Sequence, residues 1–461
     1  CTALAQNWGF AGLTMVNLFA LRCRYPQALS SSMDPVGKDN DSVLYDAISS
    51  AGFISRIHDE LAKPGTCGVG YNSLRFDDEV TRFTLWRNFC DPYAREYSQG
   101  NSRWDLIDVV RCFFALRPDS LTWPRRPDGA PSFKLEALTA ANGLEHGAAH
   151  DAMSDVTATL ALARALRDAD TELFDELLSL RFRARIEAMI DTHAMTPLVH
   201  VSGLLGTERA CLGVIVPLAP HPELKSDVIC ADLSREPHFL SMTSEEIKAR
   251  LFAKSTDLVS PDDRPSLMTI KVNKAPVLLP MSHITPAIAA RLGLGGEQLR
   301  QNLRLLRDTK KNQGWAFTEH LQTVYRGRTP VIDSNPDTAL YGAFVPNSDR
   351  SLVQEVQSSS PAELRDRSFV FTDPRLPELL FRYRARNWPD LLTEREQALW
   401  RDFCKEQWLQ GDHLTISQFN AALADEQASD ELTDKQQSAL ADLARWVAEN
   451  AKVLGLSAAS V

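Results

Sequence analysis

The chain has 461 residues, of which 44% are hydrophobic and 24% are charged, so it is long enough for two or three folded cores and is not a disordered chain. Its 50 Lys and Arg residues face 60 Asp and Glu residues, which gives a net charge of −10. This balance excludes a global basic field that would attract nucleic acid or anionic lipid, so any contact with a polyanion must be local.

The eight cysteines are scattered without C-x-x-C spacing, so neither a zinc site nor a disulfide framework is predicted, and the reducing cytoplasm is the expected compartment. Residues 1–21 carry no formal charge, yet Gln6, Asn7 and Asn17 dilute their apolar character and no basic region precedes them. We therefore expect neither a membrane segment nor a signal peptide. The chain begins with Cys rather than Met, which indicates that its first residue is not a natural start.

Secondary structure becomes readable near residue 53. Apolar residues recur at helical spacing over 53–61, and Pro64-Gly65 ends that predicted helix. The apolar run at 67–71 predicts a buried strand. Helical spacing then recurs in three further segments: 76–87, 104–116 and 153–163. Strand alternating with helix indicates an α/β layer.

The pattern changes after residue 170. An Arg-rich helical stretch at 171–190 leads to runs of β-type residues separated by Pro, Gly and Asp clusters: 197–203, 210–219, 226–233 and 267–280. Helical spacing returns at 287–292 and 297–307, and it dominates from 375 to the end. The predicted order is therefore an α/β part, a β-rich part and an all-helical part.

Two clusters of polar residues are candidates for chemistry. Asp77, Asp78 and Glu79 occupy the first turn of the helix predicted at 76–87, directly after the predicted strand. The segment from His146 to Asp155 enters the helix predicted at 153–163 in a similar way. For both clusters the structural alternative is a capped helix start, because acids there complement the helix dipole and accept free N–H groups.

The two clusters together favour phosphodiester hydrolysis. Hard divalent cations take carboxylate oxygens as ligands, and two such ions can hold the attacking and leaving oxygens of an in-line displacement. His150 stands five residues before Asp155, and a histidine there can take the proton from the attacking water because its pKa is near neutral.

Longer segments then carry a specific resemblance: GYNSLRFDDEVTR, NSRWDLIDVVRCFFALRPDSLTWP, PSFKLEALTAANGLEH and AHDAMSDV. They resemble the bacterial exodeoxyribonuclease I family, 3′→5′ exonucleases of the histidine subclass of the DEDD superfamily. The downstream segments PLVHVSG, VNKAPVL, NLRLLRD and FRYRARNWP extend the likeness from about residue 54 to at least residue 390.

The resemblance implies a fold class of three parts: an α/β RNase H-like exonuclease domain, an SH3-like β-barrel domain and an all-helical C-terminal domain. The predicted boundaries place an incomplete exonuclease domain at 53–170, a helical connection at 171–196, the SH3-like domain at 197–325 and the helical domain at 326–461. Residues 1–52 form an atypical segment that does not resemble the family.

The resemblance also implies roles for individual residues. Asp77 and Asp155 fall on metal-binding acids of a site for two Mg²⁺ ions, and His150 falls on the general base. Lys134 stands where the family usually has arginine, so the positive charge is kept and the bidentate fork is lost. Positions that line the single-strand channel are matched by Arg82, Tyr93, Tyr97 and Arg111, although ordinary packing near Pro92 is an alternative for both tyrosines.

The family's first motif, an Asp-x-Glu pair on the opening strand, is absent upstream of residue 53. None of the acids in that segment is followed two residues later by Glu: Asp34, Asp39, Asp41 and Asp46. Without those carboxylates we expect affinity for the metal pair to collapse, and without their strand the sheet edge is exposed. Foreign or frame-shifted sequence in residues 1–52 is the conjectured cause.

The expected function is processive, Mg²⁺-dependent 3′→5′ hydrolysis of single-stranded DNA to 5′-mononucleotides in DNA repair and recombination, by a cytoplasmic monomer. A catalytically impaired fragment that only binds single strands is the main alternative, and an RNA-trimming relative is a weaker one because of the long second and third domains. The resemblance further implies docking of the C-terminal tail of single-stranded DNA-binding protein. Arg300–Arg307 and Arg382–Arg386 offer contacts for that tail, against the alternative of a solvated helix face.

Overall fold

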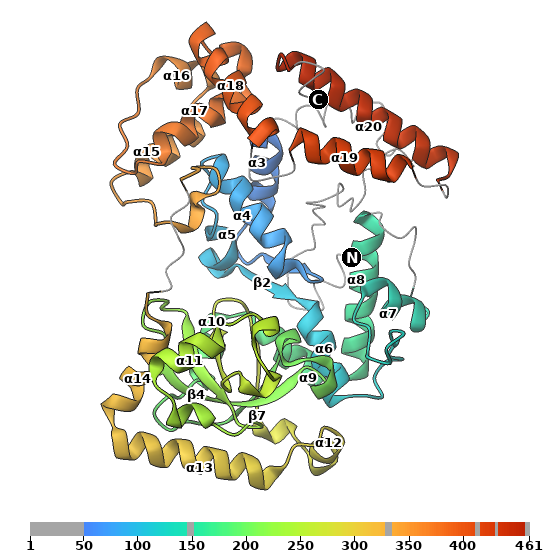
Figure 1. Ribbon diagram of the computed structural model, residues 1–461, viewed down its shortest axis with the longest axis vertical. Helices are drawn as coiled ribbons and strands as arrows, with labels where there is room; N and C mark the ends of the chain where they lie inside the picture. Colours follow the sequence, from blue (N-terminus) through green and yellow to red (C-terminus); the bar gives the residue numbers. More distant parts are fainter. Residues whose placement is uncertain (1–49, 145–151, 328–333, 411–414, 429–431, 457–461) are drawn as a thin grey trace. The chain divides into compact units, whose positions relative to one another are not determined.

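The computed structural model describes residues 50–144, 152–327, 334–410, 415–428 and 432–456 (Figure 1). The described residues form two compact units, the first from 63–79 and 96–327 and the second from 50–62, 80–95 and 334–456. No helix within the described ranges is both long and apolar enough to span a membrane.

The first unit begins with a short parallel sheet. β1 (Cys67–Gly70) pairs with β2 (Ser102–Asp105), so that Cys67 lies opposite Ser102 and Gly70 lies opposite Asp105. The strand predicted at 67–71 is thereby confirmed. The helix predicted at 104–116 is partly wrong, because Trp104 belongs to β2 and α6 (Leu106–Leu116) begins two residues later. Asp105 sets that boundary as an N-cap that accepts the Ile107 amide.

Four helices share a hydrophobic core with β2 and α6. They are α7 (Leu135–Ala141), α8 (Ala152–Ala169), α9 (Thr171–Ser179) and α10 (Arg183–Met189). The indole of Trp104 packs edge-on against Phe174 with ring centroids 5.2 Å apart, and it donates to the Leu177 carbonyl. The helices predicted at 153–163 and 171–190 are confirmed.

A five-stranded antiparallel sheet makes up the β-rich part of the first unit, in the order β6-β5-β4-β3-β7. Its strands are β3 (Leu198–Val201), β4 (Leu212–Pro220), β5 (Asp227–Asp232), β6 (Leu267–Lys271) and β7 (Val277–Pro280). The predicted β-type runs are confirmed, and the run at 267–280 is two strands joined by a turn. Four helices accompany the sheet: α11 (Ser244–Leu251), α12 (Pro286–Arg291), α13 (Gly296–Gln313) and α14 (Trp315–Tyr325).

The two faces of this sheet bury different cores, because successive side chains of a strand point to opposite faces. On β4, Val214 and Val216 pack with residues of α13 and α14, which lie beside the sheet in Figure 1. Ile215 instead joins a core that also contains Phe113 of α6 and Leu278 of β7. The α/β part and the β-rich part therefore share one core.

The second unit is helical. Its elements are α3 (Ser50–Leu61), most of α4 (Asp77–Arg87), part of α5 (Ala94–Tyr97), α15 (Arg350–Ser358), α16 (Pro361–Asp366), α17 (Leu376–Asn387), α18 (Glu394–Gln410), α19 (Ile416–Gln427) and α20 (Asp434–Val453). Trp86 and Phe89 pack with Tyr383, and the Asn387 side chain accepts the Ala51 amide at 2.9 Å. The helices predicted at 53–61, at 76–87 and from 375 onward are confirmed.

Candidate active site

The segment that carries Asp77 is a tight connection between β1 and α4. Asn72 adopts a left-handed conformation with φ of 58°, and a 3-10 turn over Ser73–Arg75 follows. A Cβ atom placed on Gly70 would lie 2.5 Å from the Cβ of Ser73, so this position requires glycine. The chain therefore turns sharply just before the candidate metal ligand.

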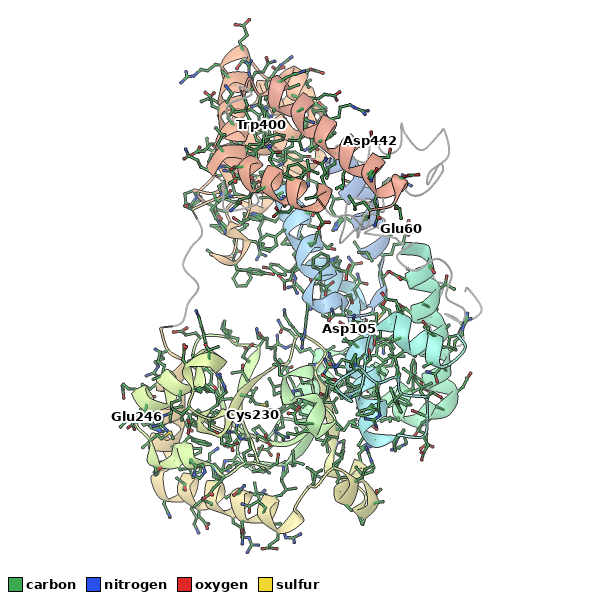
Figure 2. All side chains as sticks on the ribbon, turned by 45° about the vertical axis from the view of Figure 1, so that its right-hand side comes forward. Glu60, Asp105, Cys230, Glu246, Trp400 and Asp442 are labelled. Atoms are coloured by element: carbon green, nitrogen blue, oxygen red, sulfur yellow. The ribbon has the colours of Figure 1, made fainter. Side chains whose placement is uncertain are left out.

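Asp105 holds this turn from β2. Its carboxylate accepts the Asn72 amide at 2.7 Å, the Leu74 amide at 3.1 Å and the Ile107 amide at 3.0 Å. Figure 2 labels Asp105 at the junction of β2 and α6. Burial raises the pKa of Asp105 to about 6, although the three amide donors act in the opposite direction. Sequence reasoning missed this residue.

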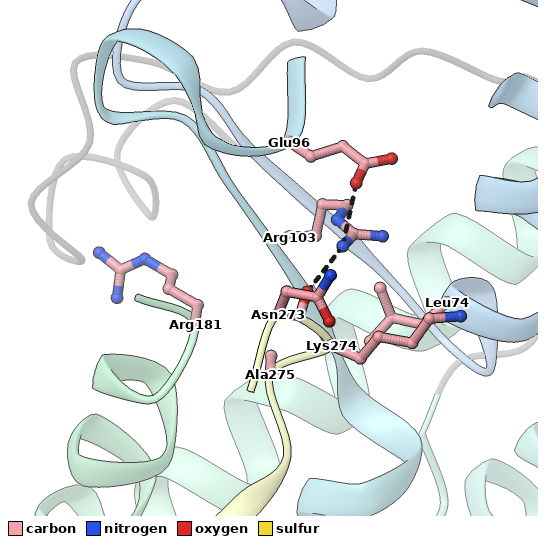
Figure 3. A pocket seen from close by; sticks show the side chains of 7 residues that line it. All are labelled: Leu74, Glu96, Arg103, Arg181, Asn273, Lys274 and Ala275. Carbon is pink, nitrogen blue, oxygen red and sulfur yellow. Dashed lines mark hydrogen bonds and ion pairs between the residues drawn. The ribbon is translucent and has the colours of Figure 1, made fainter. Parts of the chain in front are cut away.

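Arg103 holds the segment on the other side of Asp77. Its guanidinium donates to Asp78 Oδ2 at 2.6 Å, contacts Glu96 Oε2 at 3.0 Å and donates to the Asn273 carbonyl at 2.9 Å, and Figure 3 shows the last two contacts. Lys274 Nζ lies 3.3 Å from Glu79 Oε1. Asp78 and Glu79 are thus engaged in ion pairs within the protein, a structural role that differs from the helix capping weighed from the sequence.

Asp77 and Asp155 are half-buried and lie in the first turns of α4 and α8. Carboxylate oxygens are the ligand type that a hard divalent cation prefers, so the chemistry of both side chains fits a metal site. Among the described residues, however, no three His, Cys, Asp or Glu side chains form a group that could hold a metal ion. The described residues thus include two of the predicted ligands and no complete ligand set, and the metal role of both residues stays a prediction.

His150, the predicted general base, lies outside the described residues. Its role stays a prediction.

Two of the predicted substrate contacts lie close together in the first unit. Arg111 on α6 donates to Asp108 at 2.6 Å, and its guanidinium lies 5.8 Å from the ring centroid of Phe133. Lys134 follows Phe133 as the exposed residue at the N-cap position of α7. The Tyr71 hydroxyl donates to the Phe133 carbonyl at 2.5 Å, and burial raises its pKa. This contact ties the loop before α7 to the end of β1.

The remaining predicted contacts are divided between the units. Arg82 and Tyr93 belong to the second unit, where the Arg82 guanidinium lies 5.6 Å from the Tyr93 ring centroid and donates to the Tyr341 hydroxyl at 3.2 Å. Tyr97 belongs to the first unit and is 70% exposed, so core packing does not account for it. Tyr93 packs against the helical core, as its structural alternative expects.

The two basic runs considered for a partner tail differ in their surroundings. Arg300 and Arg304 project from α13 beside Glu297, in keeping with a solvated helix face. Arg382 and Arg386 pair instead with Asp337, at 2.9 and 2.7 Å, in a largely buried cluster. The second run is therefore part of the helical core and not a solvated face.

Comparison with known families defines the class of protein. Residues 47–163 match the family described as exonuclease, residues 181–327 match the exonuclease I SH3-like domain, and residues 334–450 match the exonuclease I C-terminal domain. Residues 1–58 match a different family, described as a protein of unknown function. The chain is thus an exonuclease of three parts, and the predicted fold class is confirmed.

Individual relatives identify the family more closely. The chain is 40% identical to exodeoxyribonuclease I of Escherichia coli (strain K12) over 367 residues, which cover 78% of this chain and 76% of that protein. It is 38% identical to exodeoxyribonuclease I of Haemophilus influenzae over 361 residues, which cover 77% and 75%. The chain belongs to the exodeoxyribonuclease I family, as the sequence resemblance predicted.

Solved structures agree with this assignment. Escherichia coli exonuclease I in complex with a dA16 oligonucleotide superposes with a TM-score of 0.79 at 36% identity, covering 87% of this chain and 84% of that chain. A moderately thermophilic exonuclease I from Methylocaldum szegediense gives 0.81 at 37% identity, with the same coverage. An ExoI/SSB-Ct complex gives 0.77 at 36% identity, covering 87% and 83%.

Proposed function

We propose that the chain removes 5′-mononucleotides from the 3′ end of single-stranded DNA in a reaction that needs a divalent cation. The observation that carries this proposal is the match to the exonuclease family over 47–163, the range that holds Asp77, His150 and Asp155. The relatives crystallised with oligonucleotides support DNA as the polymer.

In this proposal the residues of the chain divide the chemistry among them. Two Mg²⁺ ions, when bound, would supply the positive charge that polarises the phosphodiester and activates water. Asp77 and Asp155 would hold them through carboxylate oxygens, and His150 would accept the proton of the attacking water.

Other residues would grip the strand without reading its sequence. Arg111 and Lys134 would meet backbone phosphates beside the Phe133 ring, and the exposed Tyr97 would stack on a base. For Arg82 and Tyr93, which pack together within the helical unit, a role in the single-strand channel rests on the family resemblance alone.

A second candidate function is single-strand binding with impaired hydrolysis. It is favoured by the absence of Asp-x-Glu upstream of residue 53, together with the match of residues 1–58 to a different family, one of unknown function. In either case the C-terminal tail of single-stranded DNA-binding protein is the proposed protein partner, supported by the solved ExoI/SSB-Ct complex.

The six described cysteines are free thiols, in keeping with the cytoplasm as the proposed compartment for a monomer.

One experiment tests both candidates. The chain is incubated with single strands labelled at the 5′ or the 3′ end, in Mg²⁺ or in EDTA, and binding is measured on the same strands. Early release of the 3′ label, in Mg²⁺ only, supports hydrolysis from the 3′ end. Tight binding without release favours the second candidate, whereas neither binding nor release contradicts both.

A further inference from the structure

The guanidinium of Arg103 is buried beside the segment that carries Asp77. The side chain of Arg103 on β2 is 7% exposed, and those of Asp78 and Glu96 are 11% and 6% exposed. One guanidinium therefore meets two carboxylates and, in addition, the carbonyl of Asn273 in the β6–β7 turn.

Such a cluster is weak evidence for stability, because the cost of removing charges from water offsets most of their attraction. The cluster does fix the relative orientation of the side chains that it joins, because a planar guanidinium with several partners allows few orientations. Asp78 follows Asp77 in the first turn of α4, so the contact with Arg103 restrains the backbone next to the metal ligand.

β2 restrains the same segment at a second point. Arg103 and Asp105 are two residues apart, and alternate residues of a strand lie on the same face. Asp105 binds the amides of Asn72 and Leu74, which precede Asp77, whereas Arg103 binds Asp78, which follows it. The ligand is thus flanked by two anchors from one strand.

The SH3-like sheet contributes a third contact. Arg103 donates to the Asn273 carbonyl, and the next residue, Lys274, donates to Glu79 in the first turn of α4. The turn is tightly built, since the Lys274 amide donates to the Lys271 carbonyl at 3.1 Å and Ala275 has a φ of +44°.

We propose that Arg103 is a positioning residue for Asp77, acting through Asp78, and that its contact with Asn273 makes the orientation of Asp77 depend on the β6–β7 turn of the SH3-like sheet. This inference rests on the proposed function for the role of Asp77 as a metal ligand. It assigns the SH3-like part a task within the catalytic site.

The test compares Arg103→Met and Asp78→Asn with the control Glu96→Gln, which removes the other carboxylate of the same cluster and leaves the contact to α4 in place. Amide hydrogen exchange over residues 72–79, Mn²⁺ binding by EPR, and single-strand binding in EDTA are measured for each full-length chain. Asp77→Asn defines the Mn²⁺ signal that belongs to Asp77. Arg103→Lys keeps the positive charge and loses the planar guanidinium. It therefore separates the contribution of that planar group from the contribution of the charge.

We expect Arg103→Met and Asp78→Asn to speed exchange over 72–79 and to weaken Mn²⁺ binding by about tenfold, a typical loss when support of a metal ligand is removed. The double variant should be no weaker than the worse single variant, because both changes break one contact. Glu96→Gln should leave the Mn²⁺ affinity within about twofold, and single-strand affinity should be unchanged in all variants. If Arg103→Met does not fold, Asp78→Asn and Arg103→Lys carry the same comparison.

Unchanged exchange, or unchanged Mn²⁺ affinity where the parent has an Asp77-dependent signal, overturns the inference. A loss of single-strand affinity in Arg103→Met also overturns it, since it would make Arg103 a DNA contact. Absence of any Asp77-dependent signal in the parent is a different result, because it contradicts the proposed metal role of Asp77 itself.

Discussion

The Asp105 carboxylate accepts the Asn72 amide at 2.7 Å and so joins the end of β2 to the turn that leads to Asp77. Because this carboxylate also accepts the amides of Leu74 and Ile107, one side chain serves both as the N-cap of α6 and as an anchor for the candidate site.

The pKa of Asp105 predicts a pH-dependent effect of Asp105→Asn. The folded pKa of about 6 lies above the ordinary value of 3.8, so the stability gained from protonated Asp105 is present below pH 4 and is lost as pH rises through 6. Two pKa units correspond to roughly 2–3 kcal/mol. The free energy of unfolding of the parent minus that of Asp105→Asn should therefore fall from pH 4 to pH 7, measured by thermal or urea unfolding. A difference that stays constant or rises over this range would contradict the assignment.

Gly70→Ala should be costly because its Cβ would collide with the Cβ of Ser73, which is fixed to the backbone. We expect a loss of about 1–3 kcal/mol, as for other overpacked positions, and weaker metal binding from the displaced turn. Gly68→Ala is the matched control on β1, since its Cβ would meet only the Ser102 carbonyl at 4.0 Å. Ser73→Gly added to Gly70→Ala should recover most of the loss. Equal unfolding midpoints for the two single variants would refute the steric argument.

Lys134→Arg should strengthen the grip on the strand, because a guanidinium can bind a phosphate with two parallel hydrogen bonds and an ammonium cannot. We expect KM for single-stranded DNA to fall several-fold, and Lys134→Met to raise it and to reduce the salt dependence of binding by about one counterion. Lys225→Arg, at an exposed lysine between β4 and β5, is the control. If Lys134→Met binds DNA with the salt dependence of the parent, Lys134 does not contact a phosphate.

The elements that the sequence predicted well were those with clear periodicity or clear stops. The helix ending before Pro64-Gly65 and the helix entered at Asp77 are examples. β2 was missed because its four residues are all buried and run without a break into the apolar face of α6, so they show no alternation. The N-cap residue Asp105 was the available signal.

The supports of the candidate site could not have been predicted from local pattern. Arg103 and Asn273 are 170 residues apart in the chain, and only tertiary folding brings them together. The positions of Asp77 and Asp155 at helix starts were predicted from the sequence pattern, whereas their role as metal ligands stays a prediction. The partners of Asp78 and Glu79 come from β2 and from the SH3-like sheet, far from α4 in the sequence.

His150→Ala, made in a version of the chain with the upstream Asp-x-Glu restored, should lower the catalytic rate by about 10² or more, as expected for loss of a general base. Single-strand binding in EDTA should stay near that of the restored parent, because the histidine acts on water and does not grip the strand. Unchanged turnover would remove His150 from this role.

The most direct test of the account is Mg²⁺-dependent release of mononucleotides from a 3′-labelled single strand by two proteins, the 461-residue chain and the version extended upstream with Asp-x-Glu restored. Because the described residues include only two of the predicted carboxylate ligands, the first protein should hold the metal pair weakly, and we predict that it releases mononucleotides far more slowly than the second. Equal turnover by the two proteins would contradict the account.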